Sequence, residues 1–344
     1  MAKRTYKVLV LIDHSAHNRL LSIYGLLSTM VQNPACTSIH VASRGNPKNK
    51  QFFYDYQTTN VHVMKVMPSF TYEKNGLQFV ENTVEKKLND YDVVMVRMPP
   101  PLDKSFLSFL LRHFPRSRII NDPVNMLIAG SKQYLLNYQH MCPPMKLCTT
   151  KEDILEFSNI FPIVLKPLCN FGGKGIVKIM GSNVWLENGS ATALNEFLDK
   201  LPSQFAYLGM KYLNDVVKGD KRILIVNGRI LGACLRMPPK DSWLCNVSQG
   251  GTPAFSEADH DEIAMAKELS IDMKKRGIVI FGFDTLEDDN GKRVLSEINV
   301  INVGGLINAQ LMSGMPIVKT ASDLMWKYIE RNIQPIRQVL ELDY

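Results

Sequence analysis

The sequence has few of the features that would mark a protein held together by disulfides or metal, or one that spans a membrane. Only 6 of its 344 residues are cysteine, no pair of them forms Cys-x-x-Cys, and none has zinc-ligand spacing with a histidine. No apolar run approaches the roughly 18 residues of a membrane span, and the first one, Val8–Ile12, stops at Asp13. Free thiols are typical of a reducing compartment, so we expect a cytoplasmic protein with no membrane partner.

Signatures of several enzyme and binding classes are also missing. There is no Gly-x-Ser-x-Gly or His-Glu-x-x-His, and the glycines of Gly172–Gly175 do not form a Walker loop because Ile176 follows them. His14 and His17 stand three apart with no third metal ligand. The formal net charge of +7 favours anionic ligands, but the basic residues are not interleaved with aromatics, so we expect no nucleic-acid partner.

What is present in the first third of the chain is an alternation of strand and helix patterns. Apolar runs and helical spacing predict, in turn, strands at Val8–Ile12, Ser38–Ala42, Val61–Val66, Val93–Val96 and Arg118–Ile120, and helices over Arg19–Val31, Leu77–Leu88 and Lys104–His113. This pattern is typical of an α/β parallel sheet with helices on its faces. Ligands bind beyond the carboxyl ends of such strands, where Asp13–Asn18 and Arg97–Pro101 lie. Arg97 is then either a ligand-binding group or a surface arginine before a proline turn.

From Pro143 onward the pattern becomes α+β with antiparallel hairpins. The predicted strands are Ile163–Leu168, Ile176–Met180, Ala206–Lys211, Arg222–Val226, Arg229–Leu235, Ile278–Leu286 and Arg293–Ile298, and the predicted helices are Ala191–Lys200, Ser256 to about Arg276, with Ser256 as N-cap, and Pro316–Arg331. Asn227–Gly228 has the signature of a type I′ turn, and Pro238–Pro253 is a polar loop. This half therefore differs in architecture from the first.

The last hairpin predicts a cation site. If Asn290–Gly291 is a two-residue type I′ turn, Asp284 lies opposite Glu297, and Gly282 lies opposite Asn299. Two carboxylates directly opposed on a sheet destabilise it, unless a cation lies between them. Oxygen ligands of this kind suit Mg²⁺. The alternative is a solvated acidic hairpin tip.

Other groups could bind an anion. The glycines Gly172–Gly175 lie between two strands and form either a flap over phosphates or a plain glycine hairpin. Lys166 lies in an apolar strand and needs a partner, which could be a nucleotide phosphate or a structural carboxylate. Arg222 and Arg236 could stabilise charge in a cleft or form a surface salt-bridge strand.

Ten short motifs follow one another along nearly the whole chain. They are Val96-Arg97-Met98-Pro99, Asn121-Asp122-Pro123, Ser131-Lys132, Val164-Leu165-Lys166-Pro167-Leu168, Gly172-Gly173, Gly219-Asp220-Lys221-Arg222, Arg236-Met237-Pro238, Asn246 with Gly250-Gly251, Gly282-Phe283-Asp284 and Glu297-Ile298-Asn299-Val300. In this order the set resembles the ATP-grasp superfamily, and most closely the bacterial type of glutathione synthetase.

The resemblance implies a pre-ATP-grasp N-terminal domain over residues 1–124 and two α+β subdomains, a central (lid) subdomain over 125–212 and a C-terminal subdomain over 213–344, with ATP between these two. It also implies these roles: Lys132, Lys166, Gly172 and Gly173 at the phosphates; Met210, Tyr212 and Leu213 at adenine; Asp220 at the ribose; Asp284, Glu297 and Asn299 around Mg²⁺; Arg97, Asn246, Gly250, Gly251 and Asn302 at the substrates; and Arg222 and Arg236 at the reacting centre.

The reaction implied by the resemblance is ATP-dependent ligation of a dipeptide carboxylate to an amino-acid amine. It would join γ-glutamylcysteine to glycine through an acyl phosphate and release ADP and phosphate. Thr252 stands where the family usually has arginine, and Ile301–Gly305 replaces a Thr-Ser-Pro-Thr-like run. These departures keep open another amine acceptor, as in ribosomal-protein glutamate ligases or D-alanine ligases. Whether the protein is a homo-oligomer is also open.

Overall fold

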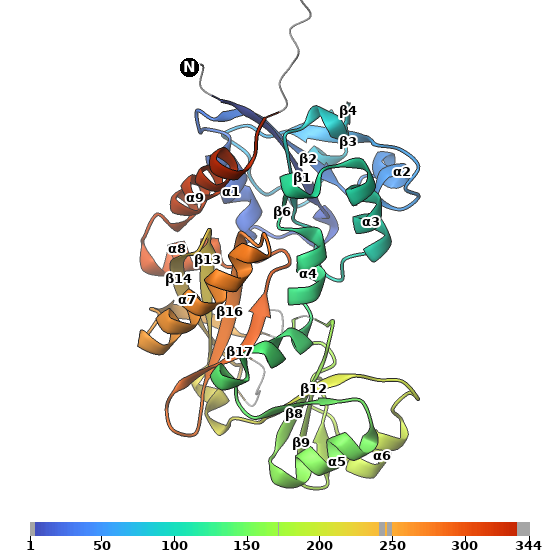
Figure 1. Ribbon diagram of the computed structural model, residues 1–344, viewed down its shortest axis with the longest axis vertical. Coiled ribbons are helices and arrows are strands. Elements are labelled where there is room, and N and C mark those ends of the chain that lie inside the picture. The colour runs from blue at the N-terminus through green and yellow to red at the C-terminus, as the bar shows by residue number, and fades with distance from the viewer. Residues whose placement is uncertain (1–3, 171, 241–244, 246–249, 336–344) are drawn as a thin grey trace, which may run out of the picture.

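The computed structural model describes residues 4–170, 172–240, 245 and 250–335. Three β-sheets follow one another along the longest axis of the molecule, and helices cover their faces (Figure 1). No helix among these residues is long and apolar enough to cross a bilayer. The division of the chain at residues 124 and 212 stays a prediction.

The first sheet has the strand order β4-β3-β2-β1-β5-β6. Its strands are β1 (Tyr6–Ile12), β2 (Cys36–Ser43), β3 (Asn60–Lys65), β4 (Val84–Lys87), β5 (Val93–Val96) and β6 (Ile119–Ile120). β1 is central and pairs in parallel with β2 and β5, and β5 pairs in parallel with β6. β3 and β4 are added in antiparallel orientation, so the sheet is mixed rather than wholly parallel as predicted.

The helix predicted over Leu77–Leu88 is wrong. The segment forms a 3-10 turn, Leu77–Phe79, and then the edge strand β4. Asn82 adopts a left-handed conformation with φ of +52°, which interrupts any helix. All four side chains of β4 are exposed, so the strand is held by its backbone pairing with β3. Such long-range hydrogen bonds leave no trace in the local spacing of apolar residues.

The second sheet has the strand order β11-β10-β9-β8-β12-β7. Its strands are β7 (Met145–Cys148), β8 (Ile163–Pro167), β9 (Val177–Met180), β10 (Asn183–Trp185), β11 (Ala191–Ala193) and β12 (Tyr207–Lys211). Helices α5 (Lys151–Ile160) and α6 (Leu194–Asp199) pack on it with their own apolar cluster. The helix predicted from Ala191 therefore begins three residues later, because the first three residues pair with β10.

The third sheet is antiparallel and has the strand order β15-β14-β13-β16-β17. Its strands are β13 (Asp220–Val226), β14 (Arg229–Met237), β15 (Thr252–Ser256), β16 (Ile280–Glu287) and β17 (Arg293–Asn299). The predicted I′ turn is confirmed, since Asn227 and Gly228 both have positive φ, 49° and 76°. Ser256 ends β15 instead of capping a helix. The cap of α7 (His260–Lys275) is Asp259, which forms a capping box with Glu262.

The other helices lie outside the segments named so far. They are α1 (Ser22–Met30), α2 (Lys50–Phe53), α3 (Lys104–His113), α4 (Pro123–Ala129), α8 (Leu306–Ser313) and α9 (Ile317–Asn332), with 3-10 segments η1 (His14–Ala16), η2 (Pro47–Asn49), η3 (Leu77–Phe79), η4 (Leu88–Asp90), η5 (Arg116–Arg118), η6 (Lys132–Met141) and η7 (Asn214–Lys218). Although far apart in sequence, α9 and α1 lie side by side beside the first sheet (Figure 1). Trp326 of α9 donates a hydrogen bond to the Met30 carbonyl at 3.0 Å.

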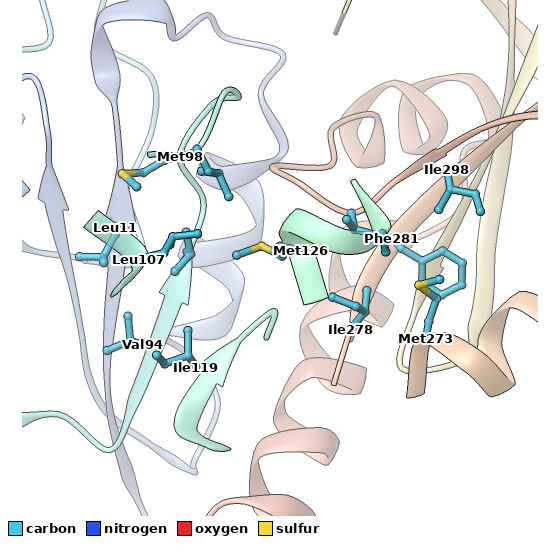
Figure 2. Packing of buried hydrophobic residues seen from close by; sticks show 14 of the residues in the cluster. Leu11, Val94, Met98, Leu107, Ile119, Met126, Met273, Ile278, Phe281 and Ile298 are labelled. Carbon is cyan, nitrogen blue, oxygen red and sulfur yellow. The ribbon is translucent and has the colours of Figure 1, made fainter. Parts of the chain in front are cut away.

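A continuous apolar core fixes the first sheet against the third. Figure 2 shows Met126 of α4 between Leu107 and Ile119 on one side and Ile278 and Phe281 on the other. All of these side chains are buried. The position of the N-terminal sheet over the rest of the molecule is therefore set by packing.

Asn121 supplies the polar part of the same junction. Its Oδ1 accepts hydrogen bonds from the backbone N–H groups of Val279 and Ile280 at 2.8 and 2.9 Å. Its Nδ2 donates to the carbonyls of Ile280 and Val300 at 2.7 and 3.0 Å. One buried side chain thus links the end of β6 to β16 and to the segment after β17.

Candidate active site

The β16–β17 hairpin pairs the acidic residues as the sequence predicts. Asp284 lies opposite Glu297, and Gly282 lies opposite Asn299. The turn itself is not the predicted two-residue one. Asp288 pairs with Lys292 across a three-residue loop, in which Gly291 is the left-handed residue with φ of +78°.

A β-bulge restores the predicted pairing further down the hairpin. Thr285 pairs with Leu295 and Asp284 pairs with Glu297, which leaves Ser296 as the extra residue. The longer turn and the bulge each shift the register by one residue, and the two shifts cancel. The bulge also aims the Ser296 carbonyl at Lys166, whose Nζ donates to it at 3.0 Å.

Asp284 lies at the centre of a buried charge cluster. It is 1% exposed, and its two carboxylate oxygens accept hydrogen bonds from Nε and Nη2 of Arg222, each at 2.7 Å. Arg236 Nη2 also donates to it, at 2.8 Å. Burial opposes its ionisation, but the two guanidinium groups outweigh burial and hold the pKa of Asp284 well below its usual range.

The cluster closes through Asp220. Arg236 donates from Nε and Nη2 to the two oxygens of Asp220 at 2.6 and 2.5 Å. Two aspartates and two arginines therefore balance each other in charge. Asn299 Nδ2 adds a longer contact of 3.3 Å to Asp284.

Two lysines reach the same strand pair. Lys132 Nζ lies 3.2 Å from Glu297 Oε1 and also donates to the Asn170 carbonyl at 2.5 Å. Burial lowers the pKa of Lys166, while Glu297 opposes that shift. Glu297 of β17 is thus the carboxylate that interacts with both Lys132 of η6 and Lys166 of β8.

One cavity, which we call the narrow cavity, lies between the second and third sheets and has a volume of about 80 Å³. It brings together six residues predicted to bind nucleotide or metal: Lys166, Met210, Tyr212, Leu213, Asp220 and Glu297. Its other lining residues are Pro143, Val164, Ile176, Lys211, Val216, Cys245, Leu286 and Ser296. Most of these others are apolar, as the walls of a site for a flat ring would be.

The second, or wide, cavity has a volume of about 440 Å³. It brings together Glu297 and five further predicted residues, which are Gly172, Arg222, Arg236, Asn299 and Asn302. Asn18 and Pro100 of the first sheet's loops also line it, so the two segments predicted to face a ligand meet here. Glu297 belongs to both the narrow and the wide cavity.

Several predicted residues lie elsewhere. Arg97 lines a third, small cavity beside the wide one. Gly250 and Gly251 precede β15 and line neither the narrow nor the wide cavity. Gly173, with φ of +81°, also lines neither, and Asn246 is outside the described residues.

Other lining residues were missed by the sequence interpretation. Ser296 enters through an unpredicted bulge, and Cys234 and Cys245 line the wide and narrow cavities as single thiols without a motif. Cys234 carried one usable signal, because it stands two residues before Arg236 on one strand and so shares its face.

The chemistry of this arrangement suits a hard cation and phosphate. Among the described residues, no group of three His, Cys, Asp or Glu side chains could hold a metal ion. Two carboxylates and the amide of Asn299 nevertheless offer oxygen donors, which is the set that Mg²⁺ takes when waters or phosphate oxygens complete its shell. Lys132, Lys166, Arg222 and Arg236 surround those donors with positive charge.

Comparison with known proteins identifies the class. Three solved structures match nearly the whole chain, and they show its fold. A D-cycloserine synthetase, DcsG, has a TM-score of 0.62 at 13% identity and covers 94% of this chain and 99% of its own. A Chryseobacterium gregarium RiPP-associated ATP-grasp ligase in complex with ADP and a leader and core peptide scores 0.57 at 15% identity, with coverage of 96% and 100%. The ATP-grasp ligase PsnB, complexed with minimal precursor, Mg and ADP, scores 0.55 at 13% identity, with coverage of 94% and 98%.

The fold is thus that of the ATP-grasp ligases. Residues 131–313 match the family model of the prokaryotic glutathione synthetase ATP-grasp domain, and the chain belongs to that family. It is 29% identical over 248 residues to the glutathione synthetase of Bradyrhizobium diazoefficiens, covering 71% of this chain and 74% of that protein. It is 27% identical over 251 residues to that of Brucella melitensis, with coverage of 72% and 76%.

Proposed function

We propose that the protein is a glutathione synthetase, which joins γ-glutamylcysteine to glycine with ATP. The donor carboxylate takes the terminal phosphoryl group of ATP and becomes an acyl phosphate. The glycine amine attacks that carbon, and phosphate leaves from the tetrahedral intermediate. Family membership and about 27% identity to glutathione synthetases support the proposal.

One observation carries it: Glu297 lines both the narrow and the wide cavity. A nucleotide in the narrow cavity would direct its phosphates toward Glu297, and a carboxylate in the wide cavity would meet them there. A transferring phosphoryl group needs its donor and acceptor oxygens in line and close together. Two cavities that meet at a charged residue would allow the two oxygens to approach each other there.

The nucleotide would lie between the second and third sheets. Met210, Tyr212 and Leu213 would hold adenine, and Asp220 would approach the ribose, since all four line the narrow cavity. Lys132 and Lys166 would turn from the Glu297 carboxylate and the Ser296 carbonyl to the phosphates. Gly172 and Gly173, both with positive φ, would bring backbone N–H groups over them.

Mg²⁺ would be held by Asp284, Glu297 and Asn299, whose oxygens are the donors it prefers. When bound, it would neutralise charge on the phosphates. Arg222 and Arg236 would then be released in part from Asp284 to the transferring phosphoryl group and the tetrahedral oxygen. Guanidinium groups suit this role because they offer two parallel donors and keep their charge.

The donor would reach these groups from the N-terminal side. Arg97 would take one of its carboxylates, since the Arg97 side chain is buried and pairs with no described carboxylate. Asn302, which lines the wide cavity with a positive φ of 43°, would also contact the substrates. Gly250, Gly251 and Asn246 would contribute from the segment that leads into β15.

The proposal is tested by ADP release. Purified protein with ATP, Mg²⁺, γ-glutamylcysteine and glycine should form ADP and glutathione in equal amounts, and omission of either amino-acid substrate should stop both. ADP formed equally well without the dipeptide would contradict a ligase role for this donor.

A second candidate keeps the donor and changes the acceptor. Thr252 and Ile301–Gly305 depart from the family pattern, and residues 301, 302, 304 and 305 line the wide cavity. A competition assay with equimolar amines, read by mass spectrometry, separates the two candidates. A larger amine preferred tenfold or more over glycine, about 1.4 kcal/mol in the transition state, would favour the second.

A further inference from the structure

The small cavity lies at the junction of the first sheet and the segment after β17. Its lining includes His17, Ser22, Arg97 and Asn302. Leu21, Asn302 and Gly304 line both this cavity and the wide one, so the two adjoin. Its volume of about 10 Å³ admits one oxygen atom of the size of a water.

Arg97 brings an unbalanced charge to this cavity. The residue is 5% exposed, its Nη2 donates to the Val303 carbonyl at 2.7 Å, and its Nε has no hydrogen-bond partner. Burial lowers its pKa to about 10, which still leaves it protonated at neutral pH. A buried cation without a counterion is costly, and an anionic ligand removes that cost.

His17 offers a second donor at the same cavity. Its Nδ1 lies 2.8 Å from the Tyr24 hydroxyl, and its Nε2 forms no hydrogen bond with a described residue. Burial, with a contribution from His14, lowers the pKa of His17 to about 4, so the ring is neutral. Burial also raises the pKa of Tyr24, which keeps its proton.

The tautomer of His17 follows from Tyr24. The tyrosine is 5% exposed, and a buried hydroxyl proton needs an acceptor. His17 Nδ1 is the acceptor within reach, so the ring proton is on Nε2. Edge-to-face contacts of the imidazole with Tyr24 and Phe79, at centroid distances of 5.5 and 6.0 Å, fix the direction of that N–H.

We infer that His17 and Arg97 form a subsite for the donor carboxylate that does not react. The inference rests on the proposed function, because the reacting carboxylate must lie near Glu297 in the wide cavity. A γ-glutamyl dipeptide has a second carboxylate at its other end. One oxygen of that group enters the small cavity, where Arg97 supplies charge and the neutral His17 N–H sets its direction.

The subsite predicts discrimination between two dipeptides. γ-Glutamylcysteine carries the second carboxylate, whereas 4-aminobutyrylcysteine lacks it and is otherwise the same. Calorimetry in the presence of Mg²⁺ and a non-hydrolysable ATP analogue should show that the wild-type protein prefers the former at least tenfold. His17→Phe keeps the ring and removes the N–H, and it should reduce this preference about tenfold while the affinity for the ATP analogue is unchanged.

Matched variants separate a subsite from a structural role. His17→Gln restores an N–H donor and should recover part of the preference. Tyr24→Phe removes the hydroxyl that fixes the His17 tautomer, and it should reduce the preference less than His17→Phe does. His14→Phe is the control, because His14 bonds to Ser43 and stacks on Phe79 without lining the small cavity.

The outcomes separate this inference from the proposed function. An equal preference in wild type and His17→Phe overturns the subsite even if glutathione is made. If His17→Phe loses the preference but the wild type forms no ADP, the subsite is supported and the proposed function is contradicted. A wild-type protein that binds the two dipeptides equally, or binds neither, overturns the subsite.

Discussion

The narrow and wide cavities meet at Glu297 but are built from different parts of the molecule. Strands β8, β12, β13 and β17, with the two residues that follow β12, supply most of the predicted nucleotide-binding residues of the narrow cavity. The wide cavity takes Arg222, Arg236, Glu297 and Asn299 from strands β13, β14 and β17, but it also draws on the loops after β1, β5, β8 and β17. Paired strands hold their side chains in fixed register, whereas loops tolerate substitution.

One departure from the family pattern falls in a loop. Ile301–Gly305 follows β17, and residues 301, 302, 304 and 305 line the wide cavity, while Lys166 and Glu297 line the narrow cavity from strands β8 and β17. Under the proposed function, a change in this loop would alter the substrate that is bound and leave the strands of the narrow cavity in place. The two cavities can therefore be tested separately.

The largest effect is expected where the cavities meet. Glu297→Gln removes a charge with little change in volume and should lower the rate of ADP formation by about 100- to 1,000-fold, as loss of one preorganised electrostatic group does. Circular dichroism should show an unchanged fold. Glu287→Gln, on the same hairpin but paired with Lys218, is the control. Unchanged turnover of Glu297→Gln at limiting Mg²⁺ would show that Glu297 has no role in the reaction.

The next effect should be confined to the narrow cavity. Lys166→Ala should weaken ATP binding about 10- to 100-fold, because a hydrogen bond to a charged group contributes about 1.5–3 kcal/mol. Donor affinity should change less. Lys146→Ala, at an exposed ion pair in the same sheet, should leave ATP affinity unchanged. Equal affinity in Lys166→Ala and wild type by calorimetry would contradict a phosphate role.

A smaller effect should be confined to the acceptor. Thr252→Arg restores the family's arginine at the start of β15 and should lower the KM for glycine by up to about tenfold, within the range of one charged hydrogen bond. The KM for ATP should not move. Steady-state kinetics at saturating donor give the answer, and an unchanged glycine KM would place the acceptor away from this residue. Thr252→Lys tests whether charge alone is sufficient.

The smallest effect should come from the junction between the sheets. Asn121→Ala leaves buried backbone groups of β16 unpaired and should destabilise the protein by about 1–3 kcal/mol. Since the N-terminal loops line only the wide cavity of the two, the KM for the donor should rise severalfold while ATP affinity holds. Thermal unfolding measures the loss of stability, and the KM for the donor and the Kd for ATP measure the effect on each cavity. An equal loss of ATP affinity would mean that the cavities are not independent.

The amount that could be predicted from sequence differs between these regions. The hairpin pairing of Asp284 with Glu297 is correct, but it results from two compensating shifts, the longer turn and the bulge at Ser296. Gly291 signals a turn and not its length. Local patterns thus locate the acidic residues, while the bulge depends on the contacts of the folded sheet.

Loops and edge strands explain what could not be predicted. β4 and β15 are edge strands, and edge strands are held by backbone pairing that side-chain periodicity does not record. His17 shows the same limit at the site. As one of two histidines without a third metal ligand it carried no signal, and it gains meaning only beside Arg97 in the small cavity.

The packing of α9 against α1 has a consequence for synthesis on the ribosome. The core of the first sheet contains Tyr6 and Val8 together with Trp326 and Ile329 of α9, and Tyr6 donates a hydrogen bond to the Ile333 carbonyl. Chains grow from the N-terminus at about 5–20 residues per second, so this apolar face waits roughly 15–60 seconds for its cover. The N-terminal sheet is therefore made early in synthesis but is among the last parts of the fold to be completed.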